Sequence, residues 1–309
     1  MYPLLLKPAV KDYIWGGTRL KTQFNIQTDL EKAAEAWVLS AHQNGPCTVV
    51  NGTHAGKTLP EVLKAWNLPL PKILVKLIDA RDRLSLQVHP DDTYAGKHHQ
   101  SLGKTEVWYV LDAQPGAELI CGFAEHMTTE QFAAAIADNT VEQAVAHYPV
   151  KRGDVFFIPP GTVHAIGAGI LLAEVQQNSD LTYRVSDWGR LGADGKPREL
   201  HVSRALDVSQ TTPYTLPCGQ VGAIEQIAGG TLRMLADCPY FGAQELALDG
   251  EYSLPDDVCG VLCVQGSATV CAPGCEPIEL ALGACVYVPA PLSATLCGNG
   301  RFVLIGDAK

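Results

Sequence analysis

Positive charge is scarce in this chain of 309 residues. Its 23 lysines and arginines stand against 33 aspartates and glutamates, which gives a net charge of -10 at pH 7. The basic residues form no cluster that could follow a phosphate backbone, so nucleic acid is not expected as a partner. A single anionic small molecule remains an acceptable ligand if one pocket is locally basic.

Segments that direct export or span a membrane are also lacking. The N-terminus has only three consecutive leucines before Lys7 and Pro8, too few for the apolar region of a signal peptide. The longest uncharged run, from Val155 to Ala173, contains two prolines and three glycines, so a membrane helix is not expected there. We expect a soluble, cytoplasmic protein with no membrane partner.

Cysteine is not scarce, since the chain has 10, but the CxxC pair of common structural zinc sites is missing. Four cysteines gather near the C-terminus with CxxxC spacings: Cys259, Cys263, Cys271 and Cys275. Without an export signal, a disulfide framework is not expected either. We interpret these residues as reduced cysteines that act as small apolar side chains.

Short β-like segments dominate the chain. Runs such as "KILVKLI", "EVWYVL", "DVFFIP" and "RFVLIG" are separated by Gly, Pro, Asn and Asp, which predicts a mainly β fold of the barrel or sandwich type. Helical spacing is clear at only two places, residues 58–66 and 128–148, and the second helix is expected to begin at Thr128 or Thr129.

A faint internal repeat predicts two copies of one β unit. The segments "EVWYVLDAQPGAEL" and "GDVFFIPPGTVHAI" correspond to "GVLCVQGSATV" and "GACVYVPAPLSATL", with Gly153 matching Gly283. His164 then falls at Ala294, so a site in the first unit has no counterpart in the second. Because residues 209–220 are the most loop-like stretch, we place the boundary between 210 and 240 and predict domains at 1–235 and 236–309.

Three segments carry the residues of a candidate metal site. In "LSLQVHPDD", Gln87 and His89 lie two residues apart, so they share one face of an extended strand. Lys104 and Glu106 in "GKTEVWYVL" follow the same spacing, and His164 begins a strand just after the turn in "FIPPGTVHAIG". Each segment therefore sends polar side chains to one side at a strand end.

Two imidazoles, a carboxylate and an amide oxygen form a mixed nitrogen and oxygen ligand set with room left for water or substrate. Zinc is the first choice for such a set, and manganese or iron could use the same ligands. The alternative is that these are ordinary polar residues at the rim of a barrel, and the spacing alone leaves that alternative open.

Four ordered motifs, "SLQVHPDD", "GKTEVWYVL", "GDVFFIPPGTVHAIG" and "LTYRVSDWGR", carry a family resemblance. The chain resembles the type I mannose-6-phosphate isomerases (phosphomannose isomerases) of the cupin superfamily, in the short bacterial form. The resemblance covers essentially the whole chain. It implies two cupin-like jelly-roll barrels with a few helices, one divalent metal that is usually zinc, and interconversion of mannose 6-phosphate and fructose 6-phosphate.

The resemblance also implies roles for particular residues. The family's metal ligands fall on Gln87, His89, Glu106 and His164, and its catalytic and substrate-binding residues fall on Lys104 and Arg184. The chain has "KTE" where longer family members have "KPE", which keeps the lysine and the glutamate but changes the residue between them. In the implied reaction a metal acts as a Lewis acid while the two cations stabilise the phosphate or the enediol oxygens.

The proton carrier stays open, since a lysine of lowered pKa, a hydroxide on the metal or a histidine of "GKHHQ" could each serve. His98 and His99 of that segment are expected to be solvated loop residues. Two other functions stay open as well. One is a cupin that binds a sugar phosphate without catalysis, and the other is a related cupin enzyme, either a dioxygenase or a glucose-6-phosphate isomerase.

Overall fold

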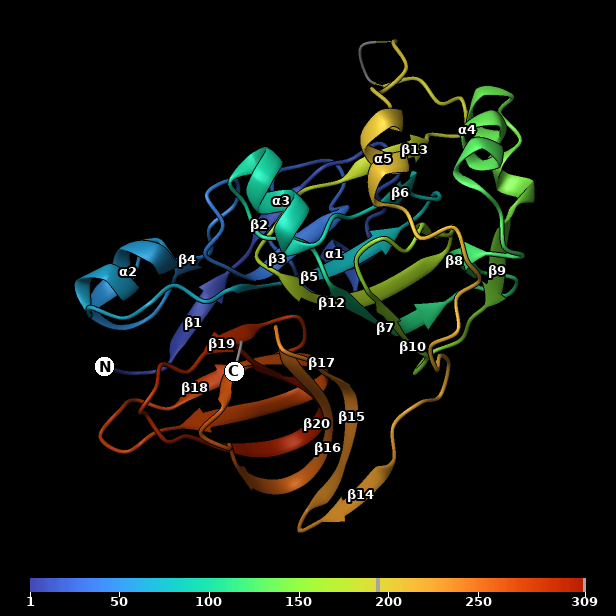
Figure 1. Cartoon of the computed structure of the whole chain (residues 1–309). Coiled ribbons are helices and arrows are strands. Elements are labelled where there is room, and N and C mark those ends of the chain that lie inside the picture. The colour runs from blue at the N-terminus through green and yellow to red at the C-terminus, as the bar shows by residue number, and fades with distance from the viewer. Residues whose placement is uncertain (193–194, 308–309) are drawn as a thin grey trace.

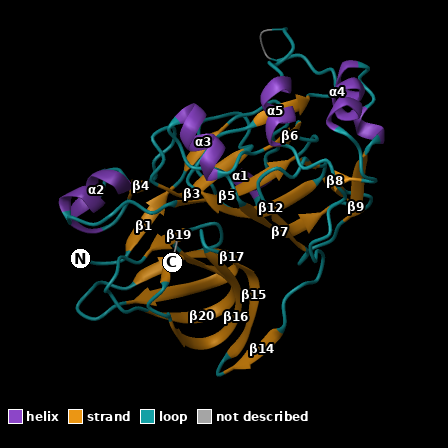
Figure 2. Cartoon of the chain, in the orientation of Figure 1, coloured by secondary structure: helices purple, strands orange, loops and turns teal. Residues whose placement is uncertain are grey.

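The computed structural model describes residues 1–192 and 195–307, and its architecture is mainly β, as predicted. The strands form three sheets, and all the pairings between named strands in these residues are antiparallel. Two sheets and most of the helices make up the upper body in Figure 1, and the third sheet makes up the lower one. Figure 2 shows that the helices lie around the upper body.

The two sheets of the upper body pack against each other around a shared apolar cluster. The six-stranded sheet has the order β10 (Val155–Ile158), β7 (Glu106–Ala113), β12 (Ile170–Gln177), β5 (Ile73–Ala80), β3 (Glu35–Ser40) and β2 (Ala9–Lys11). The five-stranded sheet has the order β13 (Tyr183–Ser186), β6 (Leu86–Val88), β11 (His164–Ile166), β8 (Glu118–Phe123) and β9 (Val145–Pro149).

The third sheet joins the two ends of the chain. Its path is β14 (Ile224–Ile227), β15 (Gly230–Asp237), β16 (Gly242–Ser253), β20 (Thr295–Gly306), β17 (Val258–Cys271), β19 (Cys285–Tyr287), β1 (Leu4–Lys7) and β4 (Thr48–Val49), with β18 (Ile278–Leu280) paired to β17. Strands β1 and β4 therefore reach the lower body from the N-terminal region (Figure 1). The division at residue 235 stays a prediction, and strand pairing crosses it where β1 pairs with β19 and where β15 pairs with β16.

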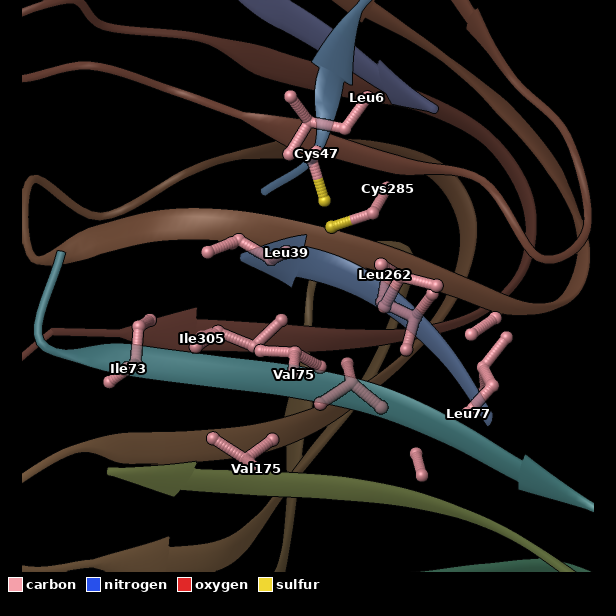
Figure 3. Packing of buried hydrophobic residues seen from close by; sticks show 14 of the residues in the cluster. Leu6, Leu39, Cys47, Ile73, Val75, Leu77, Val175, Leu262, Cys285 and Ile305 are labelled. Atoms are coloured by element: carbon pink, nitrogen blue, oxygen red, sulfur yellow. The ribbon is translucent and has the colours of Figure 1, made fainter. Parts of the chain in front are cut away.

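The long strands of the six-stranded sheet are buried on both faces. On β5, Val75 and Leu77 face the third sheet and pack with Leu262 and Ile305 (Figure 3). Ile78, on the other face of β5, packs inside the upper body. A strand buried on both sides reads as a continuous apolar run, which explains segments such as "KILVKLI". Each fully buried aliphatic side chain contributes roughly 1.5–3 kcal/mol, so this shared core holds the two bodies together.

The helices are α1 (Arg19–Thr22), α2 (Leu59–Ala65), α3 (Asp92–His99), α4 (Thr129–Ala137) and α5 (Val202–Val208), with 3-10 turns at Gly52–His54 and Val141–Gln143. The helix predicted at 58–66 is α2, with Thr58 and Glu61 in a capping box. Thr128 caps α4 as expected, but the helix predicted over 128–148 ends at Ala137. Asn139 has a φ of 56°, which stops the helix, and β9 follows.

The repeat predicted from the sequence has a structural counterpart at its two matched glycines. Gly153 (φ 91°) precedes β10, and Gly283 (φ 82°) precedes β19, so both turns need a left-handed residue before the next strand. The position that matches His164 is Ala294, which is buried beside β20. Of the described residues, only His89, Glu106 and His164 form a potential metal cluster of His, Cys, Asp and Glu side chains, and this cluster lies in the upper body.

Candidate metal and active site

Strand pairing brings the candidate residues together as two rows on the two sheets of the upper body. In the five-stranded sheet, Gln87 on β6 pairs with His164 on β11 and with Arg184 on β13. In the six-stranded sheet, Glu174 on β12 pairs with Lys76 on β5 and with Trp108 on β7. Side chains alternate along each strand, so each row points to one side of its sheet.

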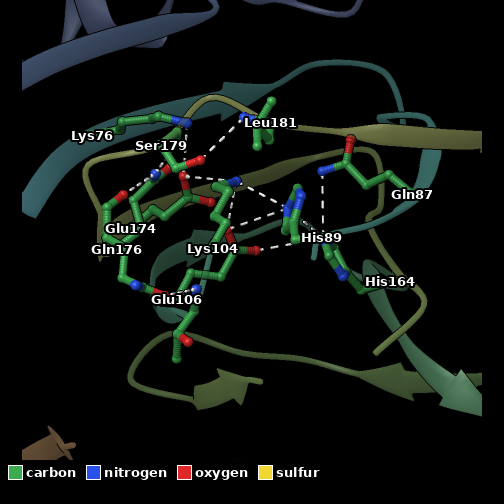
Figure 4. A network of polar contacts seen from close by, with 12 residues as sticks. Lys76, Gln87, His89, Lys104, Glu106, His164, Glu174, Gln176, Ser179 and Leu181 are labelled. Atoms are coloured by element: carbon green, nitrogen blue, oxygen red, sulfur yellow. Dashed lines mark hydrogen bonds and ion pairs between the residues drawn. The ribbon is translucent and has the colours of Figure 1, made fainter. Parts of the chain in front are cut away.

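Three side chains converge at the centre of this site: His89 directly follows β6, Glu106 begins β7 and His164 begins β11. The Nε2 atoms of His89 and His164 are 3.2 Å apart, and they lie 3.6 and 3.5 Å from the two carboxylate oxygens of Glu106. All three side chains are buried (Figure 4). Trp108 packs edge-on against the His164 ring, with 5.3 Å between the ring centroids, which limits the tilt of that imidazole.

The donor and acceptor chemistry of the cluster fits a cation. His164 Nδ1 lies 2.8 Å from the carbonyl oxygen of Thr162, so Nδ1 carries the proton and Nε2 presents a lone pair. Glu106 Oε1 is buried without a hydrogen-bond donor among the described residues. A tetrahedral zinc ion with bonds of about 2.1 Å separates its ligand atoms by about 3.4 Å, close to the separations found here.

Gln87 lies beside the cluster as the sequence predicts. Its Nε2 atom is 3.4 Å from His164 Nε2, and its Oε1 atom is 3.4 Å from the hydroxyl of Ser85. A half-turn of the amide would present the oxygen to the cluster instead, and oxygen is the amide atom that binds cations. The position of Gln87 is thus compatible with a fourth ligand, and its role as a ligand stays a prediction.

A row of buried side chains with alternating charges leads away from the cluster across the six-stranded sheet (Figure 4). This charge row consists of Lys104, Glu174 and Lys76. Lys104 Nζ lies 3.0 Å from His89 Nε2 and 2.7 Å from a Glu106 oxygen. Glu174 follows, 4.0 Å from Lys104 Nζ and 2.9 Å from Lys76 Nζ. Each buried charge has a partner of opposite sign, which offsets the cost of removing these groups from water.

Burial and these neighbours set the protonation states. Burial raises the pKa of Glu106 to about 7, with Glu174 adding to the rise and Lys104 opposing it. Burial also lowers the pKa of His164 to about 3, and together with the Lys104 charge it holds the pKa of His89 well below its ordinary value. Both imidazoles are therefore neutral at pH 7, the form that ligates metals.

The two outer members of the charge row, Glu174 and Lys76, are both ionised at pH 7. Burial opposes the charged form of Glu174, but Lys76 and Lys104 lower the pKa of this carboxyl to about 2. Burial likewise opposes the charge on Lys76, but Glu174 and Glu35 raise the pKa of this amine above its ordinary value. Glu35 also accepts a hydrogen bond of 2.7 Å from the indole of Trp37.

A cavity of about 300 Å³ opens over the cluster, large enough for a small polar ligand. Gln87, Lys104 and Arg184 line it, so three of the six predicted site residues reach the cavity. His89, Glu106 and His164 are buried, and they lie behind Gln87 and Lys104 on the side away from the cavity. The wall holds four cations against three carboxylates: Lys76, Lys104, Arg184 and Arg198, and Glu35, Glu174 and Asp180.

Several residues of this wall were missed by the sequence reasoning. Glu35, Lys76 and Glu174 lie in strands that are buried along their whole length, and a charge in such a strand was the available signal. The aromatic residues Tyr13 and Trp15 carry no comparable signal in the sequence. Their place in the cavity wall depends on the path of the N-terminal segment.

The two histidines of "GKHHQ" do not line the cavity, and the prediction that they lie in a loop is wrong. They form the last turn of α3, which begins with Asp91 as its N-cap. His98 is exposed, as expected, and stacks on Tyr94. His99 is partly buried, and its Nε2 atom lies 2.7 Å from the hydroxyl of Tyr183.

Arg184, on β13, lines the cavity. Its Nη1 donates a hydrogen bond of 2.7 Å to the carbonyl of Glu199, and its Nε is buried without a partner among the described residues. Burial lowers the pKa of Arg184, and the Arg198 charge adds to the lowering. Arg198 is held by Asp187, which accepts a hydrogen bond of 2.7 Å from its Nε. An anion in the cavity would therefore meet two oriented guanidinium groups.

The fold and the site define a class of protein: an antiparallel β protein with a buried, open-sided candidate metal cluster beside a charged cavity. The sequence matches the family "Phosphomannose isomerase type I, catalytic domain" over residues 4–133, which include Gln87, His89, Lys104 and Glu106. The mannose-6-phosphate isomerase ManA of Bacillus subtilis (strain 168) is 40% identical over 263 residues, 82% of this chain and 81% of its own.

A mannose-6-phosphate isomerase of Streptococcus mutans is 37% identical over 301 residues, which are 93% of this chain and 92% of the relative. The crystal structure of the mannose 6-phosphate isomerase from Bacillus subtilis superposes with a TM-score of 0.90 at 32% identity, covering 99% of both chains. A phosphomannose isomerase from Salmonella typhimurium shares the fold alone, with a TM-score of 0.78 at 16% identity. This chain belongs to the type I phosphomannose isomerase family.

Proposed function

We propose that this chain is a mannose-6-phosphate isomerase, which interconverts mannose 6-phosphate and fructose 6-phosphate by proton transfer between two adjacent carbons. One observation carries the proposal. Two imidazole lone pairs and the Glu106 carboxylate face one another behind a cavity whose wall contains Lys104 and Arg184. Relatives that align over most of this chain are named mannose-6-phosphate isomerases, which supports mannose 6-phosphate as the substrate.

His89, Glu106 and His164, with the amide oxygen of Gln87, are the proposed ligands of one divalent metal, most simply zinc. When bound, such an ion would polarise a sugar oxygen and lower the barrier to forming an enediol. The chain's own contribution is a fixed ligand set: Thr162 orients His164, and Lys104 and Trp108 restrict the two rings from either side.

Lys104 is the proposed catalytic cation nearest to the reacting carbons. It lies between the cluster and the cavity, and its ammonium contacts Glu106, His89 and, at 4.0 Å, Glu174. An ammonium fixed there can stabilise negative charge on an enediol oxygen without reorganising during the reaction. Glu174 keeps that charge in place, and Lys76 in turn holds Glu174 through an ion pair.

The phosphate group is proposed to bind at the other end of the cavity, at Arg184 and Arg198. Both guanidinium groups are already oriented, one by Glu199 and the other by Asp187. Planar guanidinium groups bind phosphate through two parallel hydrogen bonds, which fixes the orientation of the substrate as well as its affinity. The sugar then lies between this end and the metal cluster.

The proton carrier is proposed to be one of the titratable groups that line the cavity. Lys104 and Glu174 are the two nearest to the cluster, and they are neighbours in the row of charges that leads away from it. A histidine of α3 is a poor candidate, because neither His98 nor His99 reaches the cavity wall. Substituting Lys104 and Glu174 separately, and measuring the loss of the substrate's C2 deuterium to solvent, distinguishes the two.

No described helix has the length and apolar composition of a membrane-spanning segment. A cytoplasmic location and a domain boundary near residue 235 are proposed on the sequence patterns given above. The proposed partner is a sugar phosphate alone.

A coupled assay for fructose 6-phosphate formed from mannose 6-phosphate tests the proposed function. Metal-replete protein should turn over this substrate, lose activity on chelation and regain it on addition of zinc. Absence of turnover together with tight binding of mannose 6-phosphate would favour a binding protein without catalysis. A panel of phosphosugars, including glucose 6-phosphate, separates this enzyme from a related isomerase.

A further inference from the structure

One carboxylate of the cavity wall is held by side chains that belong to neither the metal cluster nor the charge row. Asp180 lines the cavity, and 38% of its side chain is exposed. Its Oδ2 accepts a hydrogen bond of 2.7 Å from the amide of Asn44. Its Oδ1 lies 3.7 Å from Nε2 of His42. Both contacts come from the turn that follows β3, more than a hundred residues away in the sequence.

His42 is itself fixed in one orientation. Its Nδ1 accepts a hydrogen bond of 3.2 Å from the backbone N–H of Asn44, so a neutral ring carries its proton on Nε2, the atom that faces Asp180. The ring is buried and packs edge-on against Trp37, with 5.7 Å between the centroids. Burial lowers the pKa of His42, which keeps the ring neutral at pH 7 although Asp180 opposes the shift.

The chemistry of Asp180 determines which part of a sugar phosphate it can contact. A carboxylate repels a phosphate group, so this wall suits the hydroxyl groups of the ligand, which donate hydrogen bonds to carboxylate oxygens. Sugar hydroxyls differ between substrates mainly in direction, so a carboxylate discriminates between them only if its own plane is fixed. Asn44 supplies that constraint by its hydrogen bond to Oδ2, and the His42 ring lies beside Oδ1 at 3.7 Å, beyond hydrogen-bonding distance.

We infer that Asn44 is a positioning residue, which holds the Asp180 carboxylate, beside the buried ring of His42, in the orientation in which it accepts hydrogen bonds from the hydroxyl groups of the bound sugar phosphate. The inference rests on the proposed function. It assigns part of the substrate specificity to the turn "SAHQNG", which contributes no metal ligand and no cavity-lining side chain.

The variant Asn44→Asp tests the inference, because it keeps the shape of the side chain and replaces the donor facing Asp180 by a carboxylate. Asn44 is exposed, so folding should be retained. The expected result is a rise of about tenfold in KM for mannose 6-phosphate, with metal content unchanged and a smaller change in kcat. Gln43→Glu is the matched control, because it adds the same charge at the adjacent exposed residue and should keep the wild-type KM.

A double-mutant cycle with Asp180→Asn distinguishes positioning from a general structural effect. If Asn44 acts through Asp180, adding Asn44→Asp to the Asp180→Asn protein should cause no further rise in KM, because the two side chains can still hydrogen-bond with their roles exchanged.

Three outcomes would overturn the inference: a wild-type KM for Asn44→Asp, an equal rise for Gln43→Glu, or the same rise on the Asp180→Asn background. Its failure is distinct from failure of the proposed function, which would appear as a wild-type protein that does not isomerise mannose 6-phosphate. In that case, calorimetric binding of mannose 6-phosphate to the same variants still tests whether the orientation of Asp180 matters for binding, with the same expected order of affinities.

Discussion

Replacing Glu174 with glutamine should destabilise the protein by about 3 kcal/mol at pH 7, because it removes one member of a buried charge row. Glu174 is 3% exposed and satisfies two donors at once: Lys76 Nζ lies 2.9 Å from Oε1, and the Trp108 indole donates a hydrogen bond of 2.9 Å to Oε2. Glutamine has the same shape but only one acceptor oxygen, so either the ammonium or the indole loses its partner.

The cost should depend on pH in a defined direction. The charges of Lys76 and Lys104 lower the pKa of Glu174 from 4.5 to about 2, despite the opposing effect of burial. A carboxyl whose pKa is lowered on folding contributes stability that is fully present above its unfolded pKa, here about pH 4.5. This contribution is lost as the pH falls towards 2, so the difference between wild type and Glu174→Gln should shrink over that window.

Urea unfolding of both proteins, from pH 7 down to pH 3, measures this difference. The control is Glu118→Gln, which removes a carboxylate that lies 3.0 Å from His147 but is 44% exposed, and it should cost less than about 1 kcal/mol. A cost below 1 kcal/mol for Glu174→Gln at pH 7, or a difference that grows as the pH falls, would refute the account of the charge row.

Three further predictions concern the ligands, the phosphate end and the contact between the two bodies. His164→Ala should lose the bound metal, as measured by elemental analysis, because one of about four ligands is gone, and full occupancy would refute the assignment. Arg184→Ala should keep the metal and lose most turnover; a wild-type rate would remove Arg184 from the reaction. Gly283→Ala should cost about 3 kcal/mol in urea, because at φ 82° its Cβ would lie 2.3 Å from the Phe24 carbonyl oxygen, whereas Gly274→Ala, at φ 71° with open space around it, should cost about 1. Equal costs would show that the close contact with Phe24 does not matter.

The sequence predicted that His89, Glu106 and His164 belong to one site, and these side chains do lie together, because each obeys a local rule. Gln87 and His89 follow the two-residue period, and His164 begins β11 just after a Pro-Pro-Gly turn, as expected. The spacing could not show that these side chains meet in space. That His89 and His164 lie 3.2 Å apart follows from the order β6-β11 in the five-stranded sheet, which depends on contacts over 75 residues.

The sequence failed where tertiary structure overrides a local pattern. Residues 145–149 continue the helical spacing of the segment before them. However, Asn139 has a left-handed backbone conformation that ends α4, and residues 145–149 pair with β8 as strand β9. Likewise, α3 begins at Asp92, the last residue of "HPDD", because Asp91 caps it, and its polar surface gave no periodic apolar signal.

The charge row was the larger omission. Lys76 and Glu174 stand in strands whose neighbours are apolar on both faces, and a buried charge in such a strand requires a partner. The partner comes from an adjacent strand about a hundred residues away, and the sequence alone does not contain that register. The same limitation hid Asp180 and its contacts with Asn44.

Diffraction from crystals soaked in zinc, with anomalous data collected at the zinc edge, tests the central claim most directly. The account predicts one strong peak per chain, about 2.0–2.2 Å from His89 Nε2, His164 Nε2 and a Glu106 oxygen. A peak elsewhere, or no peak between these three side chains in a protein that isomerises mannose 6-phosphate, would contradict it.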